Sequence, residues 1–564
     1  MSLFTRKRNT RLDYEIEPDE IFLDAKNIPK FDQQQFEGRL ETPIRISSLR
    51  ILLVVFLGVF VVFAWRLGNL QVVGGKAYYE RSLQNNLNRV PLFANRGVIY
   101  DRNNVPLAWN DESKTGNFFS HRSYIKEPGF AHLLGYVSYP SKDTSGNYWR
   151  EDFLGKDGLE KYYDALLRGE NGATIVEVDA EGAITSQNIV DTPVPGENLY
   201  LSIDARIQTK LYSLIASLAE TRNFSGGAGV IMDVTNGELL ALVSFPEYDP
   251  EVLSLGDDAK AISSYLNDRR KVFLNRAVSG LYSPGSIVKP FVAIAALNEN
   301  IIDPKKNILS TGSISIPNPY TPSKPTVFRD WKAHGWVDMR RAIAVSSDVY
   351  FYAVGGGYQD QKGLGIEKID RYMRFFGIAE ATGVDLPGEV EGIIPGPEWK
   401  EKNFPGDPWR IGNTYHTAIG QYGFKVTPIQ MARALGAIAD NGVLRKPHVV
   451  TNPDLVYSSE KRIEIPEEYY TISREGMHAA VKGDGTARAL NISAVDIAAK
   501  TGTAQVGVRN EYEHSWVTGF FPYKEPRYAF VILMERGPAG NLVGASFIGS
   551  QLFQWMAQET PEYF

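Results

Sequence analysis

An apolar segment near the N-terminus constrains the fold of this chain more than any other feature. From Ile51 to Trp65 the sequence reads ILLVVFLGVFVVFAW, without a charge or a proline, and Arg50 and Arg66 bound it. A helix that crosses a bilayer needs about 17 to 25 residues, and Leu49 together with the long side chain of Arg66 extends the run to that length. We therefore predict a single membrane-spanning helix over 49–72. A buried core helix fits less well because charges stand at both ends, and a signal peptide fits less well because fifty residues precede the run.

The flanks of this span give little information about its orientation. Residues 1–48 mix charges with few consecutive apolar positions, which predicts a flexible tail. The basic residues near the span balance each other: Arg39, Arg45 and Arg50 before it, and Arg66, Lys76 and Arg81 after it. A more distant cluster, Arg6, Lys7, Arg8 and Arg11, favours a cytoplasmic tail but lies too far away to weigh heavily.

Composition excludes several classes of function for the remaining chain. Its length of 564 residues predicts several domains. A formal charge of −6 provides no basic field for a phosphate backbone, so we expect no nucleic-acid partner. The absence of cysteine removes thiolate nucleophiles, disulfides and zinc-thiolate sites. Covalent catalysis in this chain must use another nucleophile.

Two folded regions are expected after the span. The stretch VPLFANRGVIYDRNNVPLAWN, residues 90–110, alternates short apolar runs with turn residues and predicts a β-rich module over 73–195. DTPVPGEN, residues 191–198, combines prolines and glycine before an alternating run, which is typical of a domain boundary. We place the second domain at 196–564.

This second domain has strand patterns at both ends and helical patterns between them. Thr235-Asn236-Gly237 between apolar runs predicts a hairpin of strands 229–234 and 238–244. Three further strands are predicted at 497–506, 515–521 and 528–534. This order indicates an α+β fold in which the first and last strands share one antiparallel sheet.

The strongest chemical signal is Ser286-Ile287-Val288-Lys289, because residues three apart share one face of a helix. A neutral lysine amine one turn away can accept the proton of a serine hydroxyl. The following segment, 291–297, is apolar at every position and predicts a helix buried on all sides, with the serine at its start. The sequence lacks a His-Glu-x-x-His motif, a Gly-x-Ser-x-Gly elbow and a phosphate-binding loop.

Two other motifs complete the constellation. Ser346-Ser347-Asp348 places a hydroxyl two positions from a short acceptor, and Lys500-Thr501-Gly502-Thr503 follows an apolar lead into a strand. In the latter motif the hydroxyls of Thr501 and Thr503 can bind a carboxylate, Lys500 supplies positive potential, and Gly502 lets a substrate approach the strand.

Similar short motifs occur elsewhere in the sequence, but without the neighbouring apolar helix or strand. Ser123 to Lys126 and Ser458 to Lys461 have the same spacing as the first motif but no apolar helix behind them, so we interpret both as solvated surface. Lys114-Thr115-Gly116 lacks a preceding apolar strand and is set aside for the same reason.

Taken together, the three motifs make the chain resemble the class B penicillin-binding proteins, whose motif trio is Ser-x-x-Lys, Ser-Asp-Asn and Lys-Thr-Gly. Further segments carry the resemblance: RGVIYDRN at 96–103, GLEKYYDALLRGENG at 158–172, and AIGQYGFKVTPIQMARA at 418–434. Asp348, in place of the usual Asn of division-type relatives, and FRDWKAHG at 328–335 are similar to the elongation-type branch, penicillin-binding protein 2.

The resemblance implies a fold and a reaction. The expected fold is α+β, with a β-rich pedestal domain resembling a dimerisation domain and a transpeptidase domain whose antiparallel sheet has helices on both faces. The reaction is serine-type acyl transfer from a D-Ala-D-Ala stem peptide to an amine of a neighbouring stem. It requires no cofactor and no metal, and β-lactams inhibit it.

Roles for the motif residues follow from the same resemblance. Ser286 is the expected nucleophile and Lys289 its base, while Ser346 and Asp348 relay and position the proton. The expected carboxylate-binding group is Lys500, Thr501, Gly502 and Thr503, and the backbone N–H groups of Ser286 and Thr503 form the oxyanion hole. Asp330 and His334 resemble a metal-binding pair, but without a cysteine or a clear third ligand we predict a hydrogen-bonded loop.

The resemblance further implies a bacterial cytoplasmic membrane protein with one span and an extracytoplasmic catalytic domain. Its expected partners are nascent stem peptides, a multi-pass glycan polymerase and other proteins of the elongation machinery. A division-type (septal) transpeptidase, a β-lactam sensor or hydrolase, and a non-catalytic scaffold of cell-wall assembly are the alternatives.

Overall fold

The structure is a computed structural model that describes residues 46–76, 87–111, 119–144, 148–178, 184–318, 321, 323–455 and 459–564. The chain divides into two compact units, Met1–Leu87 with Glu177–Ser186, and Asn88–Val176 with Gln187–Phe564. Most of the predicted tail, residues 1–45, lies outside the described residues. The boundary proposed near residue 195 falls within the second unit and stays a prediction.

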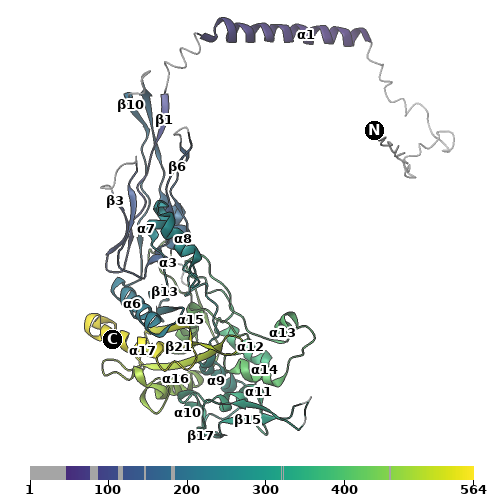
Figure 1. The fold of residues 1–564 in the computed structure, drawn as a ribbon, viewed down its shortest axis with the longest axis vertical. Coiled ribbons are helices and arrows are strands. Elements are labelled where there is room, and N and C mark those ends of the chain that lie inside the picture. The colour runs from purple at the N-terminus through teal and green to yellow at the C-terminus, as the bar shows by residue number, and fades with distance from the viewer. Residues whose placement is uncertain are drawn as a thin grey trace, which may run out of the picture. The chain divides into compact units, whose positions relative to one another are not determined.

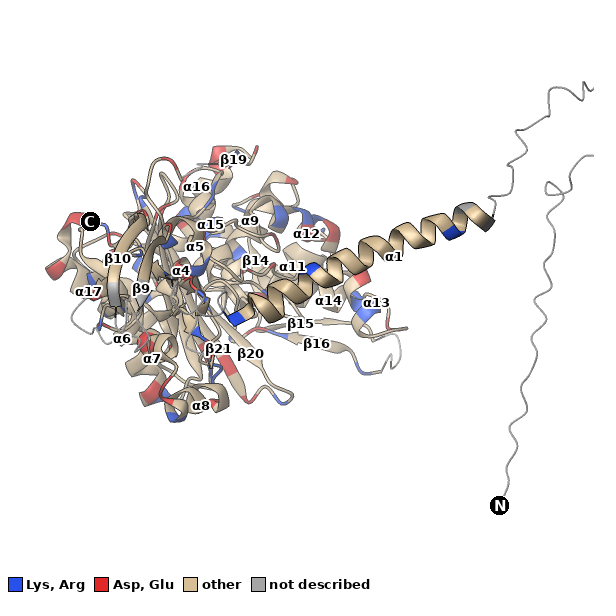
Figure 2. Cartoon of the chain, turned by 90° about the horizontal axis from the view of Figure 1, so that it is seen from above, with Lys and Arg blue, Asp and Glu red and all other residues tan. Residues whose placement is uncertain are grey.

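The first unit contains the predicted apolar helix. α1 runs from Ile46 to Gly68, and a five-residue π-helix, Asn69–Val73, continues it. Within the described residues this is the one helix long and apolar enough to cross a membrane, over Leu49–Val73. Figure 2 shows it as a nearly uncharged cylinder with basic residues toward its ends. The predicted helix over 49–72 is confirmed, and it begins three residues earlier than expected.

The N-terminal part of the second unit is rich in short strands, as predicted. A four-stranded sheet has the order β11-β2-β3-β4, a three-stranded sheet has the order β1-β9-β10, and β5–β8 and β6–β7 form separate pairs. The strands are β1 (Leu87–Leu92), β2 (Ile99–Tyr100), β3 (Pro106–Asp111), β4 (His121–Tyr124), β5 (Val137–Ser138), β6 (Ser141–Lys142), β7 (Tyr148–Arg150), β8 (Leu154–Gly155), β9 (Gly172–Val178), β10 (Ile184–Asp191) and β11 (Leu199–Tyr200); the helices are α3 (Ala131–Leu134), α4 (Gly158–Tyr162) and α5 (Asp164–Arg168).

A buried ion cluster joins separate segments of this β-rich region. The Glu160 carboxylate on α4 accepts hydrogen bonds from Arg96 and Arg122, and all three side chains are at most 1% exposed. Burial alone would raise the pKa of Glu160, but the two guanidinium groups outweigh it and lower the pKa. The segments that begin at Arg96 and Gly158 are therefore held together by charge pairing inside the fold.

A five-stranded antiparallel sheet forms the centre of the second unit (Figure 1). Its order is β13-β12-β22-β21-β20, with β12 (Gly226–Asp233), β13 (Leu239–Phe245), β20 (Ala498–Val506), β21 (Tyr512–Phe521) and β22 (Tyr528–Pro538). Strands from both ends of the domain thus share one sheet, as predicted. The Asn-Gly hairpin connects β12 and β13 as expected.

Helices cover both faces of this sheet, which confirms the expected architecture. Alternate residues of β12 point to opposite sides: Val230 belongs to the larger apolar core, and Ile231 belongs to the smaller one. The smaller core packs α6 (Ala205–Arg222) and α17 (Ala545–Glu559) against the sheet. The larger core contains α9 (Lys289–Asn298), α11 (Asp348–Gly356) and α15 (Pro428–Ala439).

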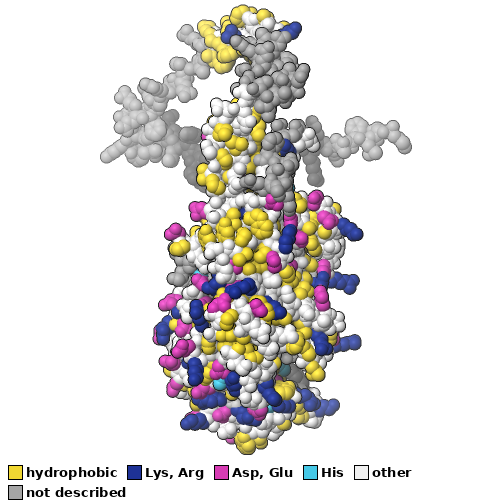
Figure 3. Space-filling view, turned by 90° about the vertical axis from the view of Figure 1, so that its left-hand side faces the viewer, with side chains coloured by type: hydrophobic (Ala, Val, Ile, Leu, Met, Phe, Trp, Pro, Cys, Tyr) yellow, Lys and Arg dark blue, Asp and Glu magenta, His cyan; other side chains and the backbone are white. Residues whose placement is uncertain are grey.

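The remaining elements surround this framework. They are α7 (Pro250–Leu255), α8 (Ala259–Asn267), α10 (Met339–Ala344), α12 (Ile366–Phe375), α13 (Pro397–Asn403), α14 (Ile411–Ala418), α16 (Glu467–Lys482), three 3-10 turns η4 (Gly285–Val288), η5 (Arg488–Leu490) and η6 (Pro561–Tyr563), and strands β14 (Ile308–Ser310), β15 (Ser313–Ile316), β16 (Thr326–Arg329), β17 (Gly335–Val337), β18 (Val443–Arg445) and β19 (Glu460–Arg462). On the face drawn in Figure 3, acidic and basic side chains intermingle over the part that contains the sheet. No broad basic area is visible on this face.

Candidate active site

Ser286 lies at the start of a fully buried helix, as the sequence predicts. It is half-buried in η4, and α9 begins directly afterwards at Lys289. Every residue of α9 from Lys289 to Leu297 is buried. Pro290 falls in the first turn of α9, where its missing N–H costs no helical hydrogen bond. The first turn after Pro284 is a 3-10 turn, so the serine precedes the α-helix proper.

The second motif lies between α10 and α11, next to the amine of Lys289. Ser346 has φ of +59°, a left-handed conformation that is costly for a non-glycine residue and typical of functional turns. The Lys289 Nζ atom donates hydrogen bonds to the Ser346 carbonyl (2.8 Å), to Ser346 Oγ (3.2 Å) and to Asp348 Oδ1 (2.6 Å). The N-terminal cap of α11 is Ser347, which leaves the Ser346 hydroxyl to the lysine.

A second lysine reaches the same hydroxyl from β20. Lys500 Nζ donates to Ser346 Oγ at 2.8 Å and to the Thr501 carbonyl at 2.8 Å, and the residue is fully buried. Burial holds the pKa of Lys500 well below its usual range, the charge of Lys289 lowers it further, and Asp348 acts in the opposite direction. The carboxylate of Asp348 pairs with Lys289, so among the described residues no ion pair offsets the burial of the Lys500 amine.

Close backbone packing positions η4 against β20. A Cβ atom on Gly502 would lie 2.8 Å from the Pro284 carbonyl oxygen and 2.8 Å from a side-chain carbon of Ile287. Gly285, at φ +57°, donates its N–H to the Gly420 carbonyl at 3.0 Å. In the structure Gly502 makes room for the nucleophile turn, and the expectation that it also lets a substrate approach the strand stays a prediction. The segment that contains Gly420, which reads AIGQYG, contacts the same turn through the hydrogen bond from Gly285.

The two threonines of the third motif differ in their environments. The Thr501 hydroxyl donates to Thr486 Oγ1 at 2.6 Å and is partly buried. Thr503 is exposed on the same strand two residues later. Since alternate residues of a strand share a face, both hydroxyls lie on one face of β20, whereas Lys500 and Gly502 lie on the other.

Asp330 fixes the turn that contains Ser346 by accepting hydrogen bonds from the residues that follow it. Its Oδ2 accepts hydrogen bonds from Ser347 Oγ (2.9 Å) and from the Val349 N–H (3.0 Å), while its Oδ1 lies 3.3 Å from His334 Nε2. A hydrogen-bonded loop was the predicted arrangement for Asp330 and His334, and the contacts agree with it. A carboxylate at the N-terminus of α11 also stabilises that helix end.

Several other predictions can be compared with the structure. Ser123 is buried in β4, so its interpretation as solvated surface is wrong, because β4, although an edge strand of its sheet, packs against α7. Its partner Lys126 is exposed and pairs with Glu251. The other decoys, Lys114 to Gly116 and Ser458, lie outside the described residues.

Sequence reasoning missed two residues at this site. Thr486, which holds Thr501, stands in no motif. His416 on α14 packs its ring 5.4 Å from Phe328 and 6.3 Å from Tyr352, measured between ring centroids. Burial lowers the pKa of His416, and the Asp348 charge opposes that effect. Neither residue had a recognisable signal, because the chain brings it to the site only through tertiary folding.

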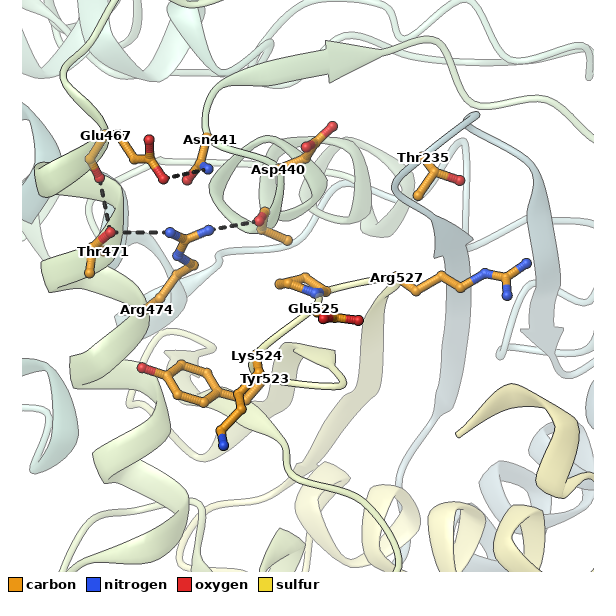
Figure 4. Close-up of a pocket in the computed structure, with 12 residues that line it drawn as sticks. Thr235, Asp440, Asn441, Glu467, Thr471, Arg474, Tyr523, Lys524, Glu525 and Arg527 are labelled. Carbon is orange, nitrogen blue, oxygen red and sulfur yellow. Dashed lines mark hydrogen bonds between the residues drawn. The ribbon is translucent and has the colours of Figure 1, made fainter.

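A separate cleft of about 640 Å³ lies between the β12–β13 turn, the β21–β22 loop, the end of α15 and the first turns of α16 (Figure 4). Its central guanidinium, Arg474, donates hydrogen bonds to the Ala439 carbonyl at 2.9 Å and to Thr471 Oγ1 at 3.1 Å. Arg474 thus stabilises the last turn of α15. None of the motif residues lines this cleft.

Comparison with known proteins agrees with this geometry. Residues 227–552 match the family described as penicillin binding protein transpeptidase domain, and residues 119–201 match the penicillin-binding protein dimerisation domain. The chain therefore belongs to the penicillin-binding protein transpeptidases, and the resemblance seen in the sequence is confirmed.

Within this family the similarity is to the elongation-type branch. The peptidoglycan D,D-transpeptidase MrdA of Escherichia coli (strain K12) is 30% identical, over 88% of this chain and 92% of the relative. Among solved structures, a complex of penicillin-binding protein 2 (PBP2) and MreC from Helicobacter pylori is similar at 29% identity and a TM-score of 0.69, covering 84% of this chain and 99% of that chain. A structure described as "Structural coordination of polymerization and crosslinking by a peptidoglycan synthase complex" has a TM-score of 0.69 at 26% identity, covering 90% and 97%.

Proposed function

We propose that this chain is a peptidoglycan D,D-transpeptidase that cross-links stem peptides through an acyl-Ser286 intermediate during cell elongation. The observation that carries the proposal is the Ser346 hydroxyl, which accepts hydrogen bonds both from Lys289, three residues after the nucleophile, and from Lys500. The MrdA relative, which is named for this reaction, supports it.

The first half of the reaction forms the acyl-enzyme. Ser286 Oγ attacks the carbonyl carbon of the penultimate D-Ala and gives its proton to a neutral amine of the lysine pair. The C–N bond to the terminal D-Ala then breaks, and the leaving nitrogen takes a proton through Ser346. We assign the exposed Thr503 hydroxyl, with the potential of Lys500, to the donor carboxylate.

The second half transfers the acyl group to the acceptor. An amine of a neighbouring stem attacks the acyl carbon and forms the new amide bond. The amine proton passes to the same relay, which returns a proton to Ser286 Oγ as the C–O bond to Ser286 breaks. Backbone N–H groups of Ser286 and Thr503 are the proposed donors to the oxyanion, and losing one such donor typically costs about 2.7 to 4 kcal/mol of barrier stabilisation.

Labelling with fluorescent penicillin tests this assignment. We expect a covalent adduct on Ser286, found by peptide mapping, and no adduct in Ser286→Ala. Ser123→Ala is the matched control, because that serine has the same spacing to a lysine but lacks the constellation; its labelling should equal that of the parent. Undiminished labelling of Ser286→Ala would refute the assigned nucleophile.

The proposed location is the cytoplasmic membrane, with α1 as the single span and the catalytic domain on the outer side. The substrate of the proposed reaction lies there, whereas the local charges do not decide the orientation. An alkaline phosphatase reporter placed after Phe564 should be active, and one placed before α1 should be inactive. The reverse pattern would contradict the cell-wall function as well as the orientation.

We further propose that a separate multi-pass polymerase makes the glycan strands. The matched regions of this chain are a dimerisation domain and a transpeptidase domain, and the similar synthase complex is described as coordinating polymerisation with crosslinking. With lipid-linked disaccharide pentapeptide, the purified chain alone should give no strands. Adding the polymerase should give strands whose cross-links disappear with Ser286→Ala, and polymerisation by this chain alone would overturn this division of labour.

A further inference from the structure

A small hairpin, built from the described residues 308–316 and 326–337, presents apolar side chains to solvent. β14 pairs with β17 and β15 pairs with β16, and the loop 330–334 connects the two ladders. Its exposed side chains contrast with Phe328, which is 7% exposed and points into the core. They are Leu309 at 44%, Val327 at 45%, Trp331 at 56% and Trp336 at 64% exposure.

Two of these side chains form one surface. Leu309 and Trp336 stand directly opposite each other across the β14–β17 ladder, so their side chains project on the same face. Trp331 lies in the connecting loop, with the Lys332 ammonium 4.6 Å from its ring centroid. We call Leu309, Trp331, Lys332 and Trp336 the aromatic platform.

Hydrogen bonds connect the residue before Trp331 to the catalytic turn. Asp330, which precedes Trp331, accepts from Ser347 and from the Val349 N–H, on either side of Asp348. The charge of Lys332 also helps to lower the pKa of Asp484, two residues before the Thr486 that binds Thr501. The loop that carries Trp331 and Lys332 therefore adjoins both the second and the third motif.

We propose that the aromatic platform binds the sugar strand of the substrate and thereby extends the catalytic cleft beyond the stem peptide. This inference rests on the proposed function. Exposed indole rings offer flat apolar faces, which fit the C–H faces of pyranose rings, and Lys332 fits the carboxylates that such a strand carries on its peptides. Large exposed aromatic side chains in a soluble surface mark an interaction site.

A narrow polymer fits this surface better than a folded protein does. A stable protein interface typically buries about 800 Å² on each partner, whereas the platform has three apolar side chains on a hairpin of short strands. Charged groups also flank it, including the exposed ion pair of Arg341 and Asp484. A protein partner is therefore the competing outcome that the experiment must detect.

The first measurement is binding of peptide-free glycan strands to the full-length chain, followed by intrinsic tryptophan fluorescence and by co-sedimentation. Trp331→Ala and Trp336→Ala should each weaken binding about tenfold, as expected for loss of a central aromatic contact. Trp149→Ala is the matched control, because Trp149 on β7 is equally exposed at 66% and also stacks with a cation, Arg150. It should bind like the parent.

The second measurement separates this proposal from the proposed function. Acylation by fluorescent penicillin, which has no sugar, should stay within about twofold of the parent in both platform variants, while cross-linking of glycan strands falls about tenfold. If penicillin fails to acylate the parent chain, the proposed function is wrong. If acylation proceeds but the platform variants bind and cross-link strands like the parent, the platform proposal is wrong.

A third result would also overturn the platform proposal. If strand binding is unchanged and cross-linking falls only when the polymerase or another protein is present, the platform binds a protein. Circular dichroism and thermal unfolding of each variant show whether the hairpin still folds. A conservative Trp331→Phe variant should bind strands more tightly than Trp331→Ala and less tightly than the parent. A merely structural role at this exposed position would not produce that ranking of affinities.

Discussion

At the scale of single residues, the main feature of the site is that two lysine amines donate hydrogen bonds to one serine hydroxyl, that of Ser346. Lys289 has an acidic partner, Asp348, at 2.6 Å, whereas the acceptors of Lys500 among the described residues are oxygens of uncharged groups. Burial and the charge of Lys289 lower the pKa of Lys500. Ser346 is placed to move a proton between the amines, because its oxygen lies 3.2 Å from one and 2.8 Å from the other.

Replacing Lys289 by methionine should slow acylation by a β-lactam. The change keeps most of the side-chain volume but removes the proposed base, and general-base catalysis typically contributes about 10²- to 10⁴-fold. The second-order acylation constant, measured by stopped-flow fluorescence, should fall in that range while the far-UV circular dichroism stays unchanged.

Lys400→Met is a suitable control for this experiment. Lys400 is also a buried lysine, 1% exposed, that pairs with an aspartate, Asp407, at 3.0 Å. Its removal should lower the melting temperature but leave acylation near the parent value. Equal acylation by Lys289→Met and the parent would dismiss Lys289 as the base.

The motif residues could be predicted from the sequence because the spacing within each motif follows from the local geometry of a helix or a strand. The helix spacing of Ser286 and Lys289 and the strand lead into Lys500 are visible within a few residues. Their supports are not visible in this way: Asp330 contacts Ser347 seventeen residues away, and Thr486 contacts Thr501 from another element. The buried position of Ser123 was missed for a similar reason, since its exposure depends on elements that pack against β4, among them α7 from a later part of the chain.

At the scale of elements, the contact of η4 with β20 determines where the nucleophile stands. A Gly502→Ala change would place a methyl group 2.8 Å from both the Pro284 carbonyl and Ile287. The 3-10 turn would have to move, and a displacement of about 1 Å from catalytic geometry can cost about 10²-fold in rate. We expect acylation to fall by about 10- to 100-fold, with a smaller loss of about 1 to 3 kcal/mol in unfolding free energy from overpacking.

A glycine with free space around it provides the comparison. A Cβ on Gly396, before α13, meets nothing within 4 Å, and its φ of −147° suits any residue. Gly396→Ala should acylate at the parent rate. If Gly502→Ala did so too, the close approach of η4 to β20 would not control the position of Ser286.

Long apolar elements were predictable, and short ones were not. The strands β12, β13 and β22 of the central sheet and the buried helix α9 have apolar runs that indicate their type, and β20 begins and β21 ends in shorter ones. The two ladders of the hairpin of residues 308–316 and 326–337 contain three or four residues on each strand, which is too short for a periodic pattern. Their pairing depends on the loop that Asp330 fixes against α11.

At the scale of the whole molecule, a buried histidine connects the β-rich region to the segment after β13. His132 on α3 is 3% exposed, its Nε2 lies 3.1 Å from the Pro246 carbonyl, and its ring packs against Tyr248. Burial lowers the pKa of His132 to about 4 from an ordinary value of 6.5; Arg276 adds to this effect, and the Pro246 carbonyl and Asp157 oppose it. The folded protein therefore keeps this imidazole neutral.

Stability should decrease as pH falls from about 6.5 to about 4, because the unfolded state binds a proton at His132 in this window and the folded state does not. The shift corresponds to at most about 3 kcal/mol. His132→Gln retains a hydrogen-bond donor for Pro246 but cannot be protonated. Denaturant unfolding of the detergent-solubilised chain should show a shallower pH dependence for His132→Gln than for the parent, and identical slopes would contradict the neutral histidine.

The central sheet has a consequence for the time at which the protein becomes active. Ala228 on β12 pairs with Leu533 on β22, about 300 residues later, and Lys500 lies on β20 at the sheet edge beyond β21. In the sheet, β22 lies between β12 and β21, so β20 and β21 have no paired strand that joins them to β12 until β22 has been made. A chain that ends before β22 therefore contains Ser286 and Lys500 but lacks the strand that places them in one sheet framework. We expect such a truncated chain to fail to acylate, so that Ser286 becomes reactive only after the last long strand has joined the sheet.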